Sequence, residues 1–145
     1  MKTIERILTQ KGHQVWSIDP DASVLEALTL MAEKRIGALL VMDATVPVGI
    51  ISERDYARSV ALKGKTSRAT PVRQIMTSPV VRVGPHQSVQ EALALVTDRR
   101  VRHLPVIAED GSLAGMVSIG DLVKARIAEA EHEAEELRHF VEGAG

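Results

Sequence analysis

The sequence contains no cysteine, and this absence excludes disulfide frameworks, thiolate metal sites and cysteine nucleophiles. Aromatic residues make up only 2% of the chain, so a surface that stacks nucleic-acid bases has almost nothing to stack with. The formal net charge of -1 leaves no basic surplus for nucleic acid or anionic lipid. No apolar run approaches the roughly 20 residues of a membrane-spanning helix or forms the core of a signal peptide. The composition therefore predicts a soluble cytoplasmic protein without nucleic-acid or membrane partners.

The chain does contain enough apolar material to fold. Its 145 residues are 45% hydrophobic and 26% charged, which is typical of globular proteins. This length suits one domain, or two halves that share one core, and excludes a large multidomain enzyme.

An internal repeat is the most informative feature of the sequence. The stretch PDASVLEAL at residues 20–28 returns 65 residues later as PHQSVQEAL at residues 85–93. The stretch GIISERD at residues 49–55 returns as GMVSIGD at residues 115–121. Because the two halves match in order and spacing, the sequence indicates a duplication.

Each half predicts the same order of elements. Ser23 and Ser88 are each followed three residues later by Glu, a capping box that starts a helix. Ser52 and Ser118 start second helices in the same way, with Asp as the third residue. Short apolar runs predict the strands, at residues 15–18, 38–42 and 48–51 in the first half and at residues 80–83, 104–107 and 113–117 in the second. The unit is strand, helix, strand, strand, helix, and the fold class is α+β.

These elements predict a division of the chain into five segments. They are an N-terminal helical segment (1–14), a first unit (15–63), a linker with a short helical turn (64–79), a second unit (80–126) and a polar C-terminal helix and tail (127–145). The tail is expected either to be solvated or to pack on a partner.

The repeated Gly-apolar-apolar-Ser-x-x-Asp motif, together with RHLPV at residues 102–106 and IMTSP at residues 75–79, resembles a tandem pair of CBS domains, named for cystathionine β-synthase. The resemblance covers about residues 15–126 and is greatest to short, stand-alone CBS pairs. It implies two units, each a small sheet flanked by helices. It also implies binding of AMP, ADP, ATP, S-adenosylmethionine or NAD in two clefts between the halves, and a disc-like homodimer.

The same resemblance implies which residues bind the ligand. Asp55 and Asp121 correspond to the ribose-binding acids, and Ser52 and Ser118 to their hydroxyl partners. The remaining positions that the resemblance implies are Thr77 and Val81 for one cleft, and Gln14, Trp16, Ile36, Gly37 and Ala38 for the other.

The chemistry of these residue types agrees with such a role. A carboxylate accepts hydrogen bonds from both hydroxyls of a ribose cis-diol, and charge-assisted bonds are the stronger kind. Phosphate needs a cation, for which Arg54, Arg102 and His103 are the candidates. The first half has no cation at the position of Arg102 and His103, so we expect two unequal clefts.

Structural interpretations of the same residues remain open. Ser-x-x-Asp is also an ordinary capping box. Arg54 is alternatively a solvated residue of a first helical turn, His103 a satisfied strand histidine, and Trp16 a core or dimer side chain. His132, Glu136 and His139 share a helix face that could hold a metal, but a solvated charged face is the favoured interpretation.

Three functions are compatible with the sequence. The leading hypothesis is a regulatory adenine-nucleotide sensor that changes dimer shape, controls an unidentified partner protein and catalyses nothing. The second is a dimeric interaction scaffold that needs no ligand. An enzyme acting on nucleotides is the poorest, because no nucleophile or metal cluster is visible and Gly64-Lys65-Thr66 lacks the earlier glycine of a phosphate-binding loop.

Overall fold

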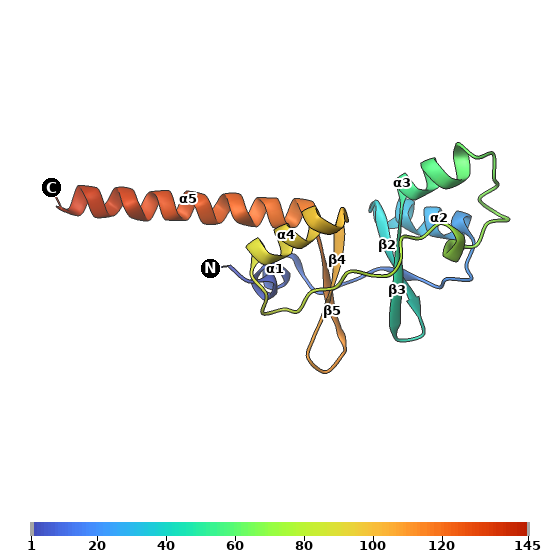
Figure 1. The fold of residues 1–145 in the computed structure, drawn as a ribbon, viewed down its shortest axis with the longest axis horizontal. Coiled ribbons are helices and arrows are strands. Elements are labelled where there is room, and N and C mark those ends of the chain that lie inside the picture. Colours follow the sequence, from blue (N-terminus) through green and yellow to red (C-terminus); the bar gives the residue numbers. More distant parts are fainter. Residues whose placement is uncertain (1, 145) are drawn as a thin grey trace. The chain divides into compact units, whose positions relative to one another are not determined.

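The computed structural model of the protein describes residues 2–144, and the chain divides into two compact units. Unit 1 contains the chain up to His13 and from Val81 onward, and unit 2 is the stretch Gln14–Val80. Each unit combines a small sheet with helices (Figure 1). The predicted α+β fold class is confirmed.

Unit 2 has a three-stranded sheet. Its elements are β1 (Ser17–Ile18), α2 (Val24–Lys34), β2 (Ala38–Asp43), β3 (Val46–Ser52), α3 (Glu53–Tyr56), the π-helical turn η1 (Ala57–Ala61) and the 3-10 turn η2 (Val72–Gln74). Strand β1 is parallel to β2, and β2 is antiparallel to β3. Helix α2 begins where the sequence predicted, because Ser23 Oγ accepts a hydrogen bond from Glu26 N and the Glu26 carboxylate accepts one from Ser23 N.

The core of unit 2 lies between α2 and the sheet. Its buried members are Val24, Ala27, Met31, Leu39, Val41, Ile51, Val60, Val72 and Ile75. The segment around η2 belongs to this unit, since Val24 N donates to Thr70 O at 2.8 Å and Val72 N donates to Ala22 O at 2.8 Å. These backbone bonds fix the stretch that leads to Thr77 against the start of α2.

Unit 1 joins the N-terminal helix to the second half of the chain. Its elements are α1 (Ile4–Lys11), α4 (Val89–Arg99), β4 (His103–Ile107), β5 (Leu113–Ser118) and α5 (Ile119–Ala144). Strands β4 and β5 are antiparallel. Helix α1 is fixed at its start by backbone bonds from Ile4 N to Gln87 O and from Val89 N to Lys2 O, both 3.0 Å long.

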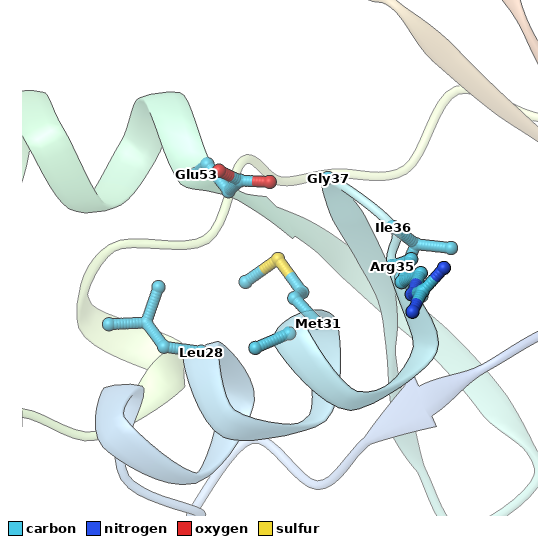
Figure 2. A pocket seen from close by; sticks show the side chains of 7 residues that line it. Leu28, Met31, Arg35, Ile36, Gly37 and Glu53 are labelled. Carbon is cyan, nitrogen blue, oxygen red and sulfur yellow. The ribbon is translucent and has the colours of Figure 1, made fainter.

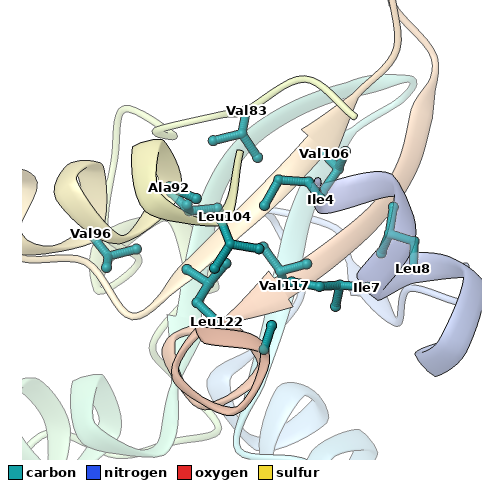
Figure 3. Close-up of a cluster of buried hydrophobic side chains, with 12 residues drawn as sticks. Ile4, Ile7, Leu8, Val83, Ala92, Val96, Leu104, Val106, Val117 and Leu122 are labelled. Atoms are coloured by element: carbon teal, nitrogen blue, oxygen red, sulfur yellow. The ribbon is translucent and has the colours of Figure 1, made fainter. Parts of the chain in front are cut away.

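Helix α1 completes the core of unit 1. Ile4, Ile7 and Leu8 are buried and point from α1 toward the strands (Figure 3). The other buried members of this cluster are Val83, Val89, Ala92, Val96, Leu104, Val106, Val117, Leu122 and Ala125. The N-terminal helix is therefore a structural part of the second repeat.

One predicted strand is reduced to a single bridge. Residues 80–83 were expected to form a strand, but only Val83 pairs, parallel to Val106. In unit 2 the equivalent pairing is extended because Leu40 N donates to Trp16 O at 3.2 Å. The residue 65 places after Leu40 is Pro105, which has no N–H to donate. The missing donor shortens this part of the second repeat.

Helix α5 continues beyond the body of unit 1 (Figure 1). Leu122 and Ala125 in its first turns are buried in the unit 1 core, whereas residues 130–143 are all exposed. Within residues 2–144, none of the helices has the combination of length and hydropathy that crossing a bilayer requires.

Candidate functional site

The end of β3 and the start of α3 form an acidic corner in unit 2. Ser52 Oγ accepts a hydrogen bond from Asp55 N at 3.2 Å, and Asp55 Oδ2 accepts bonds from Ser52 N at 2.8 Å and from the Ser52 hydroxyl at 3.0 Å. The predicted capping box is therefore present. It uses one carboxylate oxygen of Asp55 and leaves Oδ1 on the other side of the group.

Thr77 lies beside that second oxygen. Ile50 N donates to Thr77 O at 3.0 Å, and Thr77 N donates to Ile50 O at 2.8 Å, so the threonine is fixed against the edge of β3. Its hydroxyl lies 3.5 Å from Asp55 Oδ1, at the long limit of a hydrogen bond. Ser52, Asp55 and Thr77 together are the unit 2 corner.

Unit 1 repeats this arrangement at the junction of β5 and α5. Asp121 N donates to Ser118 Oγ at 3.1 Å, and Ser118 N donates to Asp121 Oδ2 at 2.8 Å. Lys11, at the end of α1, adds a positively charged contact that the unit 2 corner lacks: its Nζ lies 2.6 Å from Asp121 Oδ2 and 2.9 Å from Met116 O. Ser118, Asp121 and Lys11 together are the unit 1 corner.

The electrostatics of the unit 1 corner favour an ionised Asp121. Burial by itself raises the pKa of this carboxyl, but the hydrogen bond from Lys11 and those from Ser118 outweigh burial and hold the pKa below its usual range. The corner thus contains a carboxylate and an ammonium group side by side. Among the described residues, Asp121 Oδ1 accepts no hydrogen bond.

His103 lies across the sheet from Ser118, its partner in the pairing of β4 with β5. Burial lowers the pKa of His103, the positive charge of Lys11 lowers it further, Asp121 raises it and Arg102 lowers it. The imidazole is therefore uncharged near neutral pH. Two residues in this stretch are candidate cations for a phosphate. Arg102 is charged and exposed just before β4. His103 is uncharged and partly buried as the first residue of β4, which agrees with a structural role in the strand.

The partly buried imidazole of His103 predicts a pH-dependent stability. Since the pKa of His103 is lowered from 6.5, the unfolded chain takes up a proton before the folded chain does. The free energy of unfolding should therefore be greatest above pH 6.5 and fall as the pH drops through that value toward the lowered pKa. We expect His103→Gln to reduce this loss, as measured by urea denaturation at about pH 7.5 and about pH 5.5.

The matched control for this prediction is His139→Gln, which removes an exposed imidazole from α5. It should retain the full pH dependence of the unsubstituted chain. An undiminished pH dependence in His103→Gln would contradict the assignment of the effect to the His103 ring.

The positions predicted for adenine recognition in unit 2 are divided between a pocket and the core. Ile36 and Gly37 line a cavity of about 330 Å³ between the end of α2 and the start of α3 (Figure 2). Its remaining lining residues are Leu28, Met31, Ala32, Arg35 and Glu53. Ala38 is buried as the first residue of β2, and Glu53 N donates to Gly37 O at 3.0 Å.

Trp16 packs against the unit 2 core rather than presenting a free ring. It is a partly buried neighbour of the core cluster, and Lys34 Nζ lies 4.2 Å from the centre of its ring. A cation already occupies this ring face. The structure thus favours the core interpretation of Trp16 over an adenine stack. Gln14, two residues earlier, is exposed.

The sequence-predicted residues fall into two groups by unit. Unit 2 carries Gln14, Trp16, Ile36, Gly37, Ala38, Ser52, Arg54, Asp55 and Thr77, and unit 1 carries Val81, Arg102, His103, Ser118 and Asp121. Arg54 is exposed in the first turn of α3 and forms no ion pair within the part of the chain that the structure describes. Val81 packs partly buried against the unit 1 core.

Sequence reasoning missed Lys11. Its signal lay in the repeat, because the residue 65 places before Thr77 is Gly12, the neighbour of Lys11. The repeat therefore predicts that the segment around Gly12 contacts Asp121, as Thr77 contacts Asp55. On the tail, the exposed His132 Nε2 lies 3.0 Å from Glu136 Oε1, and no group of three potential metal ligands gathers anywhere in residues 2–144.

Two α+β units, each with a Ser-x-x-Asp corner where its last strand meets a helix, define the class of protein as a duplicated module. The family model described as "CBS domain" matches residues 6–62 and 72–128. The chain therefore belongs to the CBS-domain family and forms a CBS pair, which confirms the resemblance drawn from the motifs.

Known proteins resemble this chain over most of its length. The CBS domain-containing protein CBSX3, mitochondrial, of Arabidopsis thaliana is 36% identical over 151 residues, which cover 97% of this chain and 72% of that protein. The crystal structure of the CBS domain protein NE2398 shares 47% identity with a TM-score of 0.81, covering 88% of this chain and 99% of that one. The CBS domain protein PAE2072 from Pyrobaculum aerophilum, complexed with AMP, shares 27% identity with a TM-score of 0.71, covering 82% and 88%.

Proposed function

We propose that this CBS pair is a regulatory module that binds an adenine nucleotide and transmits its occupancy to a partner protein. The observation that carries the proposal is the duplicated corner, in which Asp55 and Asp121 each use Oδ2 for the helix cap. Among the described residues Asp121 Oδ1 accepts no hydrogen bond and Asp55 Oδ1 has only the long contact with the Thr77 hydroxyl, so each Oδ1 can accept a further donor. The AMP complex of the similar protein PAE2072 supports an adenosine-containing ligand.

The geometry suits a ribose at both carboxylates. A cap that fixes Oδ2 also fixes the direction in which Oδ1 points, so a sugar hydroxyl meets a preorganised acceptor. The carboxylate would repel phosphate, and the phosphate therefore needs a cation elsewhere. Lys11 provides an ammonium group beside Asp121 that the unit 2 corner lacks. We accordingly expect phosphate-bearing ligands to favour the unit 1 corner.

Regulation requires that the ligand bind two shapes of the protein unequally. A nucleotide with the same affinity for both shapes would bind without effect. In this proposal the protein is a homodimer that catalyses no reaction. Bound AMP, ADP, ATP, NAD or S-adenosylmethionine is therefore released without chemical change. Intact nucleotide after prolonged incubation is the expected result, and product formation would favour an enzyme instead.

Titration of the thermal unfolding transition tests nucleotide binding directly. A ligand present at 100 times its dissociation constant should stabilise the protein by about 2.7 kcal/mol. We expect AMP or one of its relatives to give this shift, and 2′-deoxy-AMP to give a smaller one because it lacks one hydroxyl of the diol. The absence of a shift with all five compounds would overturn the proposal.

Asparagine variants separate ligand binding from folding. Asp55→Asn and Asp121→Asn keep an oxygen for the helix cap but remove the charge that strengthens the bond to a ribose hydroxyl. We expect each to reduce affinity by roughly tenfold at its own corner, since a hydrogen bond to a charged group contributes about 1.5–3 kcal/mol. Ser23→Ala, which removes the side-chain cap of α2 and leaves both Ser-x-x-Asp caps in place, is the control for lost capping alone.

The second candidate is a scaffold that binds its partner without ligand. The exposed apolar side chains of α5 favour it, because they offer a binding surface made of residues other than those of the two corners. Asp55→Ala and Asp121→Ala distinguish the two functions. If both variants bind the partner as the native chain does, and nucleotide has no influence, the scaffold is the correct function.

A further inference from the structure

Helix α5 carries a continuous apolar stripe that the unit 1 core does not use. Its members are exposed, with fractions of 44% for Val123, 55% for Ile127, 64% for Leu137 and 63% for Val141, and Ala130 and Ala134 lie between them. Leu122 and Ala125, by contrast, are buried in the core. The stripe and the packed face are therefore different sides of one helix.

The spacing of the stripe alternates between four and three residues. Val123, Ile127, Ala130, Ala134, Leu137 and Val141 follow this alternation without a break. Such a repeat keeps one apolar seam facing a second helix in a left-handed coiled coil. In heptad terms the a positions are Ile127, Ala134 and Val141, and the d positions are Val123, Ala130 and Leu137.

The residue types at these positions favour a coiled coil of two parallel helices. β-branched residues at a with leucine at d favour parallel dimers. Here Ile127 and Val141 occupy a positions, and Leu137 occupies a d position. The alanines between them allow two helices to approach closely.

The flanking charges decide the orientation. In a parallel, in-register pair each g residue faces the e residue of the next heptad on the partner helix. Arg126 then faces Glu131, and Glu133 faces Arg138, so both contacts join opposite charges and each occurs twice by symmetry. Glu133 and Arg138 are exposed on the part of α5 beyond the unit 1 core. Arg126 is half-buried.

The antiparallel alternative places like charges together. With the whole seam overlapped, e residues face e residues and g residues face g residues. Glu131 and Glu133 then each face their own copy, and Lys124 faces Arg138. All three contacts are repulsive, so the sequence disfavours this arrangement.

We propose that the seam of α5 is a dimerisation surface, and that it pairs parallel and in register with the same helix of a second copy of this chain. The occupant is another copy because the seam and its flanking charges are complementary to themselves. This inference does not depend on nucleotide binding. It assigns to α5 the role of holding two copies of the chain together with their α5 helices parallel.

Single-cysteine variants test the seam, because the native chain contains no cysteine. Under mild oxidation Ala130→Cys should form a covalent dimer, since two d positions of a parallel pair lie within the reach of a disulfide. Ala128→Cys is the matched control: the same substitution two residues earlier, exposed, and outside the seam. Equal cross-linking of the two variants, or none of Ala130→Cys, would overturn the proposal.

Leu137→Cys tests the orientation. In the parallel arrangement Leu137 faces its own copy and should cross-link. In the fully overlapped antiparallel arrangement Leu137 faces Ile127, and the two copies of residue 137 are about 15 Å apart, which a disulfide cannot span. Cross-linking of Ala130→Cys without that of Leu137→Cys would therefore exclude the parallel, in-register pair.

Charge reversal tests the flanking contacts in the Ala130→Cys background. Glu133→Arg should slow cross-linking by about fivefold, since it places two like-charge contacts in the dimer, and Arg138→Glu should do the same. The double variant restores opposite charges and should return to within about twofold of the starting rate. Glu135→Arg, the same charge change away from the seam, should have no effect. Equal rates for Glu133→Arg and Glu135→Arg would contradict the assigned register.

Discussion

Replacing Leu8 with alanine should lower the free energy of unfolding by about 2–5 kcal/mol. Leu8 is fully buried in unit 1, where it joins α1 to the cluster that includes Val117 and Leu122. Its truncation removes transfer free energy and leaves a cavity that the surrounding strands fill only in part. Urea denaturation measures the change directly.

The control for this prediction is Leu62→Ala, the same truncation at a leucine that is 81% exposed. It should change stability by no more than about 0.5 kcal/mol. The Leu8 variant also loosens the helix that carries Lys11, so the pairing of Lys11 with Asp121 should weaken in parallel. A loss of less than about 1 kcal/mol on Leu8→Ala would contradict the docking of α1 on unit 1.

Adding one methyl group at Gly115 should destabilise the protein by about 1–3 kcal/mol, as overpacking of a filled core does. A Cβ at this position would lie 2.7 Å from Leu8 Cδ2 and 3.0 Å from Leu8 Cδ1. Since Leu8 is fully buried, its side chain has no solvent to move into. Gly120→Ala is the control, because its Cβ would meet Ser118 Oγ at an ordinary 3.6 Å.

The two variants together form a thermodynamic cycle. Leu8→Ala removes both methyl groups that the new Cβ would meet, so Gly115→Ala should cost less in that background than in the native chain. Urea denaturation of the native chain, both single variants and the double variant gives the coupling energy. Additive costs, within about 0.5 kcal/mol, would show that the contact between α1 and β5 does not cause the strain.

Local patterns predicted the elements of the repeat correctly where a short-range contact decides the structure. The capping boxes at Ser23 and Ser52 form with the expected partners, since donor and acceptor are three residues apart. The strand-to-helix junctions follow from the same signal. The duplicated acids were visible for the same reason, because their place in the motif depends on neighbours in sequence.

Long-range contacts could not be predicted in this way. No local pattern indicates that Thr3 pairs with Ser88, or that Lys11 reaches Asp121 across more than a hundred residues. The uncharged state of His103 is equally non-local, since it depends on burial and on the charge of Lys11. The shortened strand at Val83 had a local cause in Pro105, but only a comparison of the two repeats brings it out.

The assignment of α1 to unit 1 has a consequence for how the chain folds as the ribosome makes it. Unit 2 is a continuous stretch that can become complete once Val80 has emerged, whereas unit 1 needs both the first residues and the start of α5. Domains that are complete fold as units during synthesis. We therefore expect unit 2 to fold first, and Ile4, Ile7 and Leu8 to stay solvated until the strands of unit 1 that they pack against have been made.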